Sequence, residues 1–305
     1  MHFYRNPFIP IYNPDMMRSI LFLFLFFVSG LAFSQQLPVH WDELTASDWP
    51  AALEKSNQTC ILPIGVLEKH GPHSPLGTDL IHVREWAAHA TKQEYAVVFP
   101  DYFYGQINEA RQQPGTFALP SHVIYDLLEA TCDEIARNGF KKIVILNGHG
   151  GNPEFLHFFM QSLLNKRHDY VVYLYEPKSN DQEYNKAYLK MHKSDPNNDM
   201  HAGERETATL LYYRPDLMKM DRAASQSGAD QKRLTLPDIY TPIWWYSSFP
   251  NHYSGEGAKA TTEFGKFVAD HEIATFLKAL RTIKNDTKTL GLQNEFYDRV
   301  DHLNK

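Results

Sequence analysis

The sequence predicts a single α/β domain with a mostly parallel central sheet flanked by helices. The first observation is a set of short, nearly unbroken apolar runs, of which 60–67 and 142–146 are the clearest. Such runs are typical of strands that helices cover on both faces, as in a parallel sheet. The second is that helical patterns alternate with these runs. The third is that no linker rich in proline, serine and glycine divides the chain.

Each expected element follows from its apolar period and its flanking residues. Strands are expected at 60–67, 96–100, 142–146 and 170–175. Helices are expected at 41–58, 80–94, 121–138, 153–166, 201–213 and 258–281. Ser121 is the expected N-cap of its helix, and Gly139 lies at the C-terminal end of the same helix. The polar segment 176–200 has no strong period and indicates an insertion or a flap, and 221–256 indicates an aromatic-rich loop.

Composition and charge indicate an ordinary globular protein that is not expected to bind nucleic acid. The chain has 305 residues, 43% of them hydrophobic and 22% charged, which is close to an ordinary globular protein. Its formal net charge is -6 and no long basic run is present. Nucleic acid is therefore not an expected partner.

The first residues have the order of a secretory signal. Arg18 precedes an apolar stretch at 20–28, and small residues follow. This order of charge, apolar core and small-residue site predicts that residues 1–34 are a signal peptide. Cleavage after Ser34 would leave Gln35 first.

Two further expectations follow from this segment. Met16 or Met17 is an alternative start, with the residues before it a spurious extension. A short membrane anchor is the competing interpretation, but the apolar run is too short to cross a bilayer comfortably. The expected domain is thus 35–305, either periplasmic or secreted, with no stable membrane span after cleavage.

The two cysteines, Cys60 and Cys132, are expected to be free and buried. An exported protein can form disulfides. However, Cys60 opens an apolar strand and Cys132 lies in a helical pattern, which favours two buried thiols.

Three separated segments carry residues suited to metal binding. Two of them follow expected strands, and ligands collect beyond the carboxyl ends of parallel strands. The candidate side chains are Glu68, His70, Asp79, His149, Asp199, His201, Glu204 and Glu206. Mixed nitrogen and oxygen ligands suit zinc, manganese or iron. More than four candidates indicate a pair of ions that share a bridging carboxylate.

Each segment taken alone has a simpler interpretation. A single loop histidine is more often a surface residue than a ligand. Segment 147–152 resembles a turn or a phosphate-binding loop, although it lacks the glycine spacing of a dinucleotide fingerprint. Glu204 and Glu206 could be solvated helix charges. The metal interpretation depends on the three segments together.

Several motifs point to one family. Segments 63–73 with 77–79, 147–152, 201–207, 114–116 and 257–265 resemble the ordered signatures of the creatininase (creatinine amidohydrolase) family. The resemblance covers roughly residues 40 to 280. It implies a creatininase-like α/β domain with two metal ions, zinc as first choice and manganese or iron as alternatives. It also implies a ring-shaped homo-oligomer, often a hexamer.

The resemblance also implies roles for individual residues. Glu68 and His149 bind one ion, His70 binds the other, and Asp79 bridges both. His201 falls on the position of the proton-transfer residue.

One departure from the family pattern concerns a metal ligand. Gly151 stands where creatininase has a ligand glutamate, and Glu204 stands where creatininase has an apolar residue. We expect Glu204 to supply the missing carboxylate. Glu206 is then expected to hydrogen-bond to a metal ligand or to the nucleophilic water without contacting an ion itself. The same argument allows the two glutamates to exchange roles. The segment 109–111 also lacks the histidine that many relatives carry, which argues against creatinine as the substrate.

The expected reaction is hydrolysis of a small cyclic amide or formamide by a metal-bound hydroxide, with His201 passing a proton to the leaving nitrogen. Trp244 and Trp245 either wall the substrate pocket or pack in the core or a subunit contact. A metal-dependent peptidase of the same family is the main alternative. A non-catalytic metal- or ligand-binding envelope protein is a second alternative, which the intact ligand set disfavours.

Overall fold

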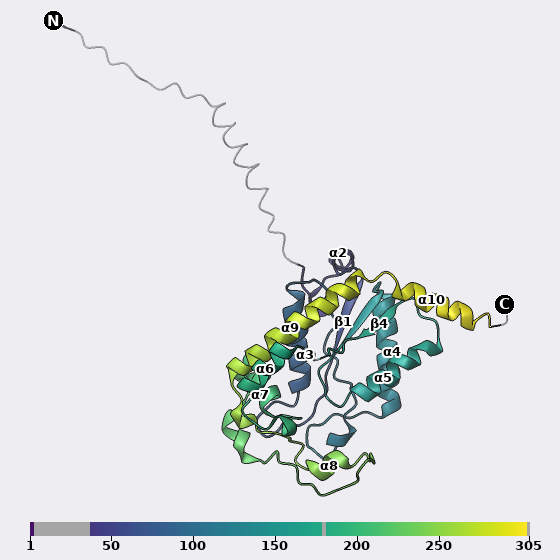
Figure 1. The fold of residues 1–305 in the computed structure, drawn as a ribbon. Helices are drawn as coiled ribbons and strands as arrows, with labels where there is room; N and C mark the ends of the chain where they lie inside the picture. Colours follow the sequence, from purple (N-terminus) through teal and green to yellow (C-terminus); the bar gives the residue numbers. More distant parts are fainter. Residues whose placement is uncertain (3–36, 179–180, 304–305) are drawn as a thin grey trace. The chain divides into compact units, whose positions relative to one another are not determined.

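The structure is a computed structural model that describes residues 1–2, 37–178 and 181–303. Residues 38–305 form one compact unit, which is the unit described below (Figure 1). Residues 3–34 of the expected signal peptide lie outside the described residues. Among the described helices, none is long and apolar enough to cross a membrane.

The central sheet is parallel throughout. Its four strands are β1 (Thr59–Ile64), β2 (Val97–Val98), β3 (Lys142–Asn147) and β4 (Val171–Leu174). They lie in the order β2-β1-β3-β4, and every neighbouring pair is parallel. All six residues of β1 are buried, as expected for a strand covered on both faces. The predicted fold class and the four predicted strands are confirmed, and each strand except β3 is shorter than predicted.

Helices cover both faces of the sheet, with α3 and α9 on one face and α4 and α5 on the other (Figure 1). The described helices are α2 (Trp49–Lys55), α3 (Thr78–Thr91), α4 (Ser121–Arg137), α5 (Pro153–Ser162), α6 (Gln182–Met191), α7 (Glu204–Tyr213), α8 (Trp244–Ser248), α9 (Thr262–Asn285) and α10 (Thr289–Val300). Short 3₁₀ turns connect several of them. The α7 helix packs against both α3 and α9, which brings its first turn toward the carboxyl edge of the sheet.

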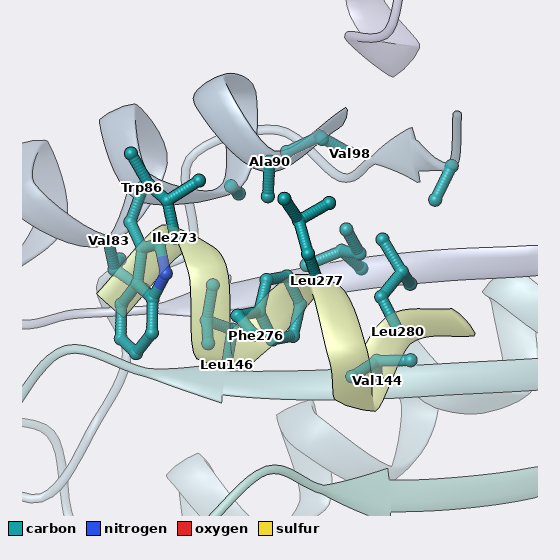
Figure 2. Packing of buried hydrophobic residues seen from close by; sticks show 13 residues of the cluster. Val83, Trp86, Ala90, Val98, Val144, Leu146, Ile273, Phe276, Leu277 and Leu280 are labelled. Carbon is teal, nitrogen blue, oxygen red and sulfur yellow. The ribbon is translucent and has the colours of Figure 1, made fainter. Parts of the chain in front are cut away.

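The main hydrophobic core lies between the sheet and the α3–α9 pair (Figure 2). Val83 and Trp86 of α3 meet Phe276 and Leu280 of α9 over Val144 of β3. Burying one such side chain contributes roughly 1.5–3 kcal/mol. This packing fixes α3 against the strands, and so fixes the position of its first turn. Cys60 and Cys132 are both buried and free, as predicted.

The predicted helix at 41–58 is wrong in its extent. A 3₁₀ turn at Trp41–Glu43 precedes α2, which begins only at Trp49. Pro50 suits only the first turn of a helix, because it has no N–H to donate. Asn57 and Gln58 have φ angles of 51° and 54°, so the helix ends before them.

Four further elements differ from prediction. The segment 176–200 contains α6, whose N-cap Asp181 accepts a hydrogen bond from the Tyr184 backbone N–H. Tyr184 stacks on the ring of His271 in α9 at 3.5 Å between centroids, so the helix is held by aromatic contacts rather than by an aliphatic stripe. The α8 and α10 helices were not predicted, and Pro120 rather than Ser121 is the N-cap of α4.

Candidate metal centre

The two glycine- and histidine-rich loops meet because their strands are neighbours. Ile64 at the end of β1 lies opposite Asn147 at the end of β3. The loops that follow therefore leave the sheet at the same edge, as predicted. Asp79 lies in the first turn of α3, where the helix N–H groups favour a negative charge.

Four of the predicted ligands form one buried cluster. The His149 Nδ1 atom lies 2.9 Å from Glu68 Oε1 and 2.8 Å from Asp79 Oδ2. On the other side of Asp79, Oδ1 lies 3.0 Å from His70 Nε2. Two groups of candidate ligand atoms result, one from Glu68, Asp79 and His149 and one from His70, Asp79 and Glu206, with atoms within 4.8 Å in each. Asp79 belongs to both groups.

The donor set fits a pair of divalent cations. Glu68 Oε1 and Asp79 Oδ2 are buried and form no hydrogen bond within the described part of the chain. A polar neighbour of both is His149 Nδ1, at 2.9 and 2.8 Å, which faces both oxygens without forming a hydrogen bond to either. A cation among these three atoms would satisfy both buried oxygens. The His70 Nδ1 atom lies 3.3 Å from the Glu68 carbonyl oxygen. Because a carbonyl only accepts, Nδ1 carries a proton, and Nε2 is the nitrogen that faces Asp79 and would bind an ion, as in a metal-ligating histidine.

The electrostatic field of the cluster is negative. Burial opposes the charged form of His70, but the carboxylates of Asp79 and Glu68 outweigh burial and raise the pKa of His70 to about 10. Burial also opposes ionisation of Glu68, yet the imidazoles of His201 and His149 hold the pKa of Glu68 well below its usual range. The carboxylates are therefore ionised. The same negative field that favours a proton on His70 when no ion is bound would favour a divalent cation in place of that proton.

The structure corrects the assignment of the two glutamates of α7. The Glu204 carboxylate accepts hydrogen bonds from the backbone N–H groups of Lys193 at 2.8 Å and Ser194 at 2.6 Å. Glu206 Oε2 instead lies 3.8 Å from His70 Nε2. Residues two positions apart on a helix point in directions about 200° apart, so only one of the two can face the cluster. That one is Glu206, and the predicted position of Glu204 at the cluster is wrong.

Gly151 is required by the approach of its own loop to the cluster. A Cβ atom there would lie 2.5 Å from His149 Nε2 and 2.6 Å from Glu109 Oε1. A glutamate at this position would displace the His149 ring, so the second carboxylate must come from another segment. The loop itself is closed by side chains, with Asn147 Nδ2 donating to the His149 carbonyl at 2.8 Å and Asn152 Nδ2 donating to Asn147 Oδ1 at 3.0 Å.

His201 lies beside the cluster. Its Nε2 atom lies 2.8 Å from the Lys69 carbonyl oxygen, so Nε2 carries the proton and Nδ1 is bare. Its ring centroid is 4.3 Å from that of His70. Burial lowers the pKa of His201, which favours the neutral form. Candidate ligand atoms of Glu68, His70 and His201 also lie within 4.8 Å of one another.

Asp199, the remaining candidate, has a structural environment. Its carboxylate accepts hydrogen bonds from the backbone N–H of Glu204 at 2.6 Å and of Arg205 at 3.1 Å. It also lies 2.6 Å from His192 Nε2. These contacts satisfy N–H groups at the start of α7, and Asp199 is in none of the candidate ligand groups.

Sequence reasoning missed His252, which is buried and contacts the Glu68 carboxylate through Nε2. The segment reaches the cluster because Ser254 and His201 pair as an antiparallel bridge. No motif or period could have indicated this contact, because 184 residues separate His252 from Glu68.

A cavity of about 720 Å³ opens at the cluster. Its lining includes Asp79, His149 and Glu206, together with aromatic and charged side chains of α3, α6, α7 and α9. Neither Trp244 nor Trp245 lines this cavity. Trp244 is exposed, and Trp245 is buried against His252. Of the two interpretations left open by the sequence, a wall of this cavity is excluded, and Trp245 packs in the core.

Comparison with known proteins identifies the family of the chain. A family model described as creatininase, creatinine amidohydrolase, matches residues 42–280. The chain belongs to the creatininase family. A creatinine amidohydrolase of Pseudomonas putida is 24% identical over 204 residues, which are 61% of this chain and 76% of that protein.

Another relative has a different activity in its name. A mycofactocin precursor peptide peptidase of Mycolicibacterium smegmatis is 32% identical over 164 residues, which span 51% of this chain and 58% of the peptidase. Among solved structures, a manganese form of creatininase matches with a TM-score of 0.67 at 20% identity, covering 81% of this chain and 99% of that one. A zinc–zinc form matches with a TM-score of 0.66 at 21% identity and the same coverage. These structures share the fold.

Proposed function

We propose that this protein is a metal-dependent amidohydrolase that hydrolyses a carbon–nitrogen bond of a small cyclic amide or a formamide. The observation that carries the proposal is the pair of candidate ligand groups sharing Asp79, with two buried carboxylate oxygens that form no hydrogen bond within the described residues. Membership of the creatininase family supports the coarser statement that the protein is a hydrolase acting on carbon–nitrogen bonds.

The proposed ligand set follows the cluster. Glu68 and His149 would hold one ion, His70 and Glu206 would hold the other, and Asp79 would contribute to both. When bound, two divalent ions lower the pKa of a coordinated water and polarise the carbonyl of the substrate. Zinc is the first choice, because a mixed nitrogen and oxygen set suits it, and manganese or iron are alternatives. The fold is shared with a manganese and a zinc–zinc form of creatininase.

His201 is the proposed proton-transfer residue. Its Nε2 proton is committed to the Lys69 carbonyl, so the bare Nδ1 is the atom that takes a proton from the attacking water. The same nitrogen then returns the proton to the leaving nitrogen of the amide.

A second candidate function is hydrolysis of a peptide bond. The cavity of about 720 Å³ is larger than a small ring needs and falls in the range of pockets for larger ligands. One relative named as a peptide peptidase is also 32% identical to the aligned part of this chain.

A substrate screen tests the proposal and separates the two candidates. Protein stripped with a chelator and reloaded with zinc or manganese is incubated with lactams, cyclic ureas, formamides and short peptides. The proposal expects cleavage of a lactam or a formamide that is lost with the chelator and restored by one metal. Cleavage of peptides alone would favour the second candidate. Two bound ions with no hydrolysis of any class would favour a non-catalytic binding protein.

Replacing His201 separates catalysis from metal binding. His201→Ala should keep both ions and lower the turnover by roughly 10²–10⁴, which is the usual size of general acid–base assistance. Metal analysis and turnover are measured on the same preparation. Loss of an ion from this variant would make His201 a ligand and would remove its proposed role.

A further inference from the structure

Three buried side chains form a chain of hydrogen bonds that ends on the metal cluster. The Trp245 indole N–H donates to His252 Nδ1 at 2.7 Å. His252 Nε2 contacts Glu68 Oε2. Trp245 is 9% exposed, His252 is 2% exposed and Glu68 is fully buried, so water does not compete for these contacts.

The direction of this chain of hydrogen bonds follows from its first member. An indole nitrogen can only donate, so His252 Nδ1 must accept. The single ring proton of a neutral His252 is therefore on Nε2, where it is donated to the Glu68 carboxylate. Trp245 thus selects the tautomer of His252 without any change in its protonation.

The two oxygens of Glu68 have different partners. Oε2 accepts from His252, while Oε1 forms no hydrogen bond within the described residues and lies 2.9 Å from His149 Nδ1, on the side of the ligand cluster. A carboxylate held through one oxygen cannot rotate freely, and it presents the other oxygen in one direction. An ion at the Glu68–Asp79–His149 position would meet Oε1 already aimed at it.

The backbone conformation of His252 directs its ring toward Glu68. His252 has a φ of 51°, in the left-handed region that side chains rarely adopt. Its N–H is bonded to the Phe249 carbonyl at 2.9 Å, which closes the turn after α8 and points the ring at Glu68. Such a conformation has a cost and persists only when the surroundings hold it.

We propose that His252, with its proton placed by Trp245, is a positioning residue that orients the Glu68 carboxylate and sets the affinity of the ion bound there. The proposal rests on the proposed role of Glu68 as a metal ligand. Removing a residue that hydrogen-bonds to a metal ligand typically lowers the metal affinity by roughly 10–100-fold. The effect should fall on one of the two ions, because Glu68 Oε1 lies 2.9 Å from His149 Nδ1 but 4.0 Å from His70 Nε2. In the described structure His252 forms no hydrogen bond or ion pair with His70 or Glu206.

The experiment measures the affinity of each ion by competition with a chelator, in the full-length protein loaded with zinc. His252→Asn suits the left-handed backbone but is too short to reach Glu68, and it should weaken one ion by roughly 10–100-fold and leave the other unchanged. His252→Gln keeps an N–H at about the reach of Nε2 and should recover most of that loss. A role in packing alone predicts neither the selectivity for one ion nor the rescue by glutamine.

The tryptophan pair provides a matched comparison. Trp245→Phe removes the N–H donor and should weaken the same ion, by a smaller factor than His252→Asn. Trp244→Phe makes the same chemical change at the neighbouring residue, which is 41% exposed, and should leave both affinities unchanged. If His252→Asn does not fold, this comparison decides the question, and equal affinities in the two tryptophan variants would overturn the proposal.

Glu68→Gln separates the positioning proposal from the proposed function. If Glu68→Gln loses the ion and a folded His252→Asn binds both ions as the wild type does, the positioning role is wrong and the ligand role of Glu68 is supported. If Glu68→Gln binds both ions with wild-type affinity, the ligand role fails, and the positioning proposal falls with it.

Discussion

At the residue scale, the first turn of α7 carries two glutamates with opposite surroundings. Glu204 is fully buried and its carboxylate accepts backbone N–H groups from the loop before α7. Glu206 is partly exposed and faces the cluster, where its Oε2 also accepts the Ala202 N–H at 2.6 Å. Glu204 therefore stabilises the fold, and Glu206 is available to bind an ion.

Substituting each glutamate tests this division. Glu206→Gln should lose one of the two ions and keep the fold, because it removes a charged ligand at the cavity. Glu204→Gln should keep both ions and lower the free energy of unfolding by about 1–3 kcal/mol, because buried N–H groups lose a charged acceptor. Metal analysis and urea unfolding of the two variants check the prediction. An ion lost from Glu204→Gln alone would restore the assignment made from the sequence.

The residues of the candidate site differ in how far the sequence could predict them. Glu68, His70 and His149 lie in loops that follow recognisable strands, and Asp79 begins the helix after the first of these loops. The shared carboxyl edge of a parallel sheet therefore predicts that they lie near one another. The choice between Glu204 and Glu206 depends on the rotation of α7 about its axis, which is set by packing against α9. The contact of His252 depends on a long loop folding back, for which no local pattern exists.

At the element scale, one carboxylate joins three helices beside the cavity. Glu272 of α9 lies 2.8 Å from His82 Nε2 of α3 and 2.8 Å from Arg205 Nη2 of α7. Burial opposes its ionisation, but His82 and Arg205 outweigh burial and lower the pKa of Glu272 to about 2. This contact fixes α7, and hence Glu206, relative to Asp79 on α3.

The lowered pKa makes a prediction about stability and pH. The pKa of Glu272 falls from its usual 4.5 to about 2 on folding. The ionised carboxylate therefore contributes fully to the free energy of unfolding above pH 4.5, and this contribution disappears as the pH falls through 2. We expect Glu272→Gln to lose roughly 2–3 kcal/mol of unfolding free energy at pH 7, and the difference from the wild type to shrink between pH 4.5 and pH 2. Urea unfolding with chelator present throughout measures this without a contribution from bound metal.

An exposed pair on the same helix provides the control. Asp270→Asn breaks an ion pair with Lys266 in which both side chains are more than half exposed, so it should cost at most about 1 kcal/mol. A deficit in Glu272→Gln that is the same at pH 7 and pH 2.5 would contradict an electrostatic role for Glu272.

The elements themselves were predictable where their apolar pattern is strong. The β1 and β3 strands are continuous apolar runs, and α4 has a clear apolar stripe between a proline and a glycine. The α6 helix was missed because its contacts are made by tyrosines in a polar sequence. The α10 helix was missed because Tyr297 is its only buried residue in the described structure.

At the scale of the whole molecule, export and assembly stay predictions. The predicted homo-oligomer would need a surface for contact between subunits. Several exposed apolar side chains lie in one segment of the chain. They are Leu234, Leu236, Ile239, Tyr240, Ile243, Trp244 and Tyr246. Exposed apolar patches of this kind are common at contacts between proteins.

The predicted signal peptide sets the start of the mature protein. Cleavage after Ser34 should give an exported chain that begins near Gln35, because the small residues there suit a signal peptidase. Intact mass measurement of protein recovered from the periplasm or the medium checks this. An exported protein that keeps residues 17 to 34 would show that the segment is not a cleaved signal.

The two-ion site bridged by Asp79 is the central claim, and the metal content of one variant tests it most directly. The wild type should bind about two divalent ions per chain. Asp79→Ala should bind neither ion tightly, because the Glu68–Asp79–His149 group and the His70–Asp79–Glu206 group both include this carboxylate. Asp216→Ala, at an exposed surface position, is the control and should keep both ions. A folded Asp79→Ala protein that retains one full ion per chain would contradict the bridge.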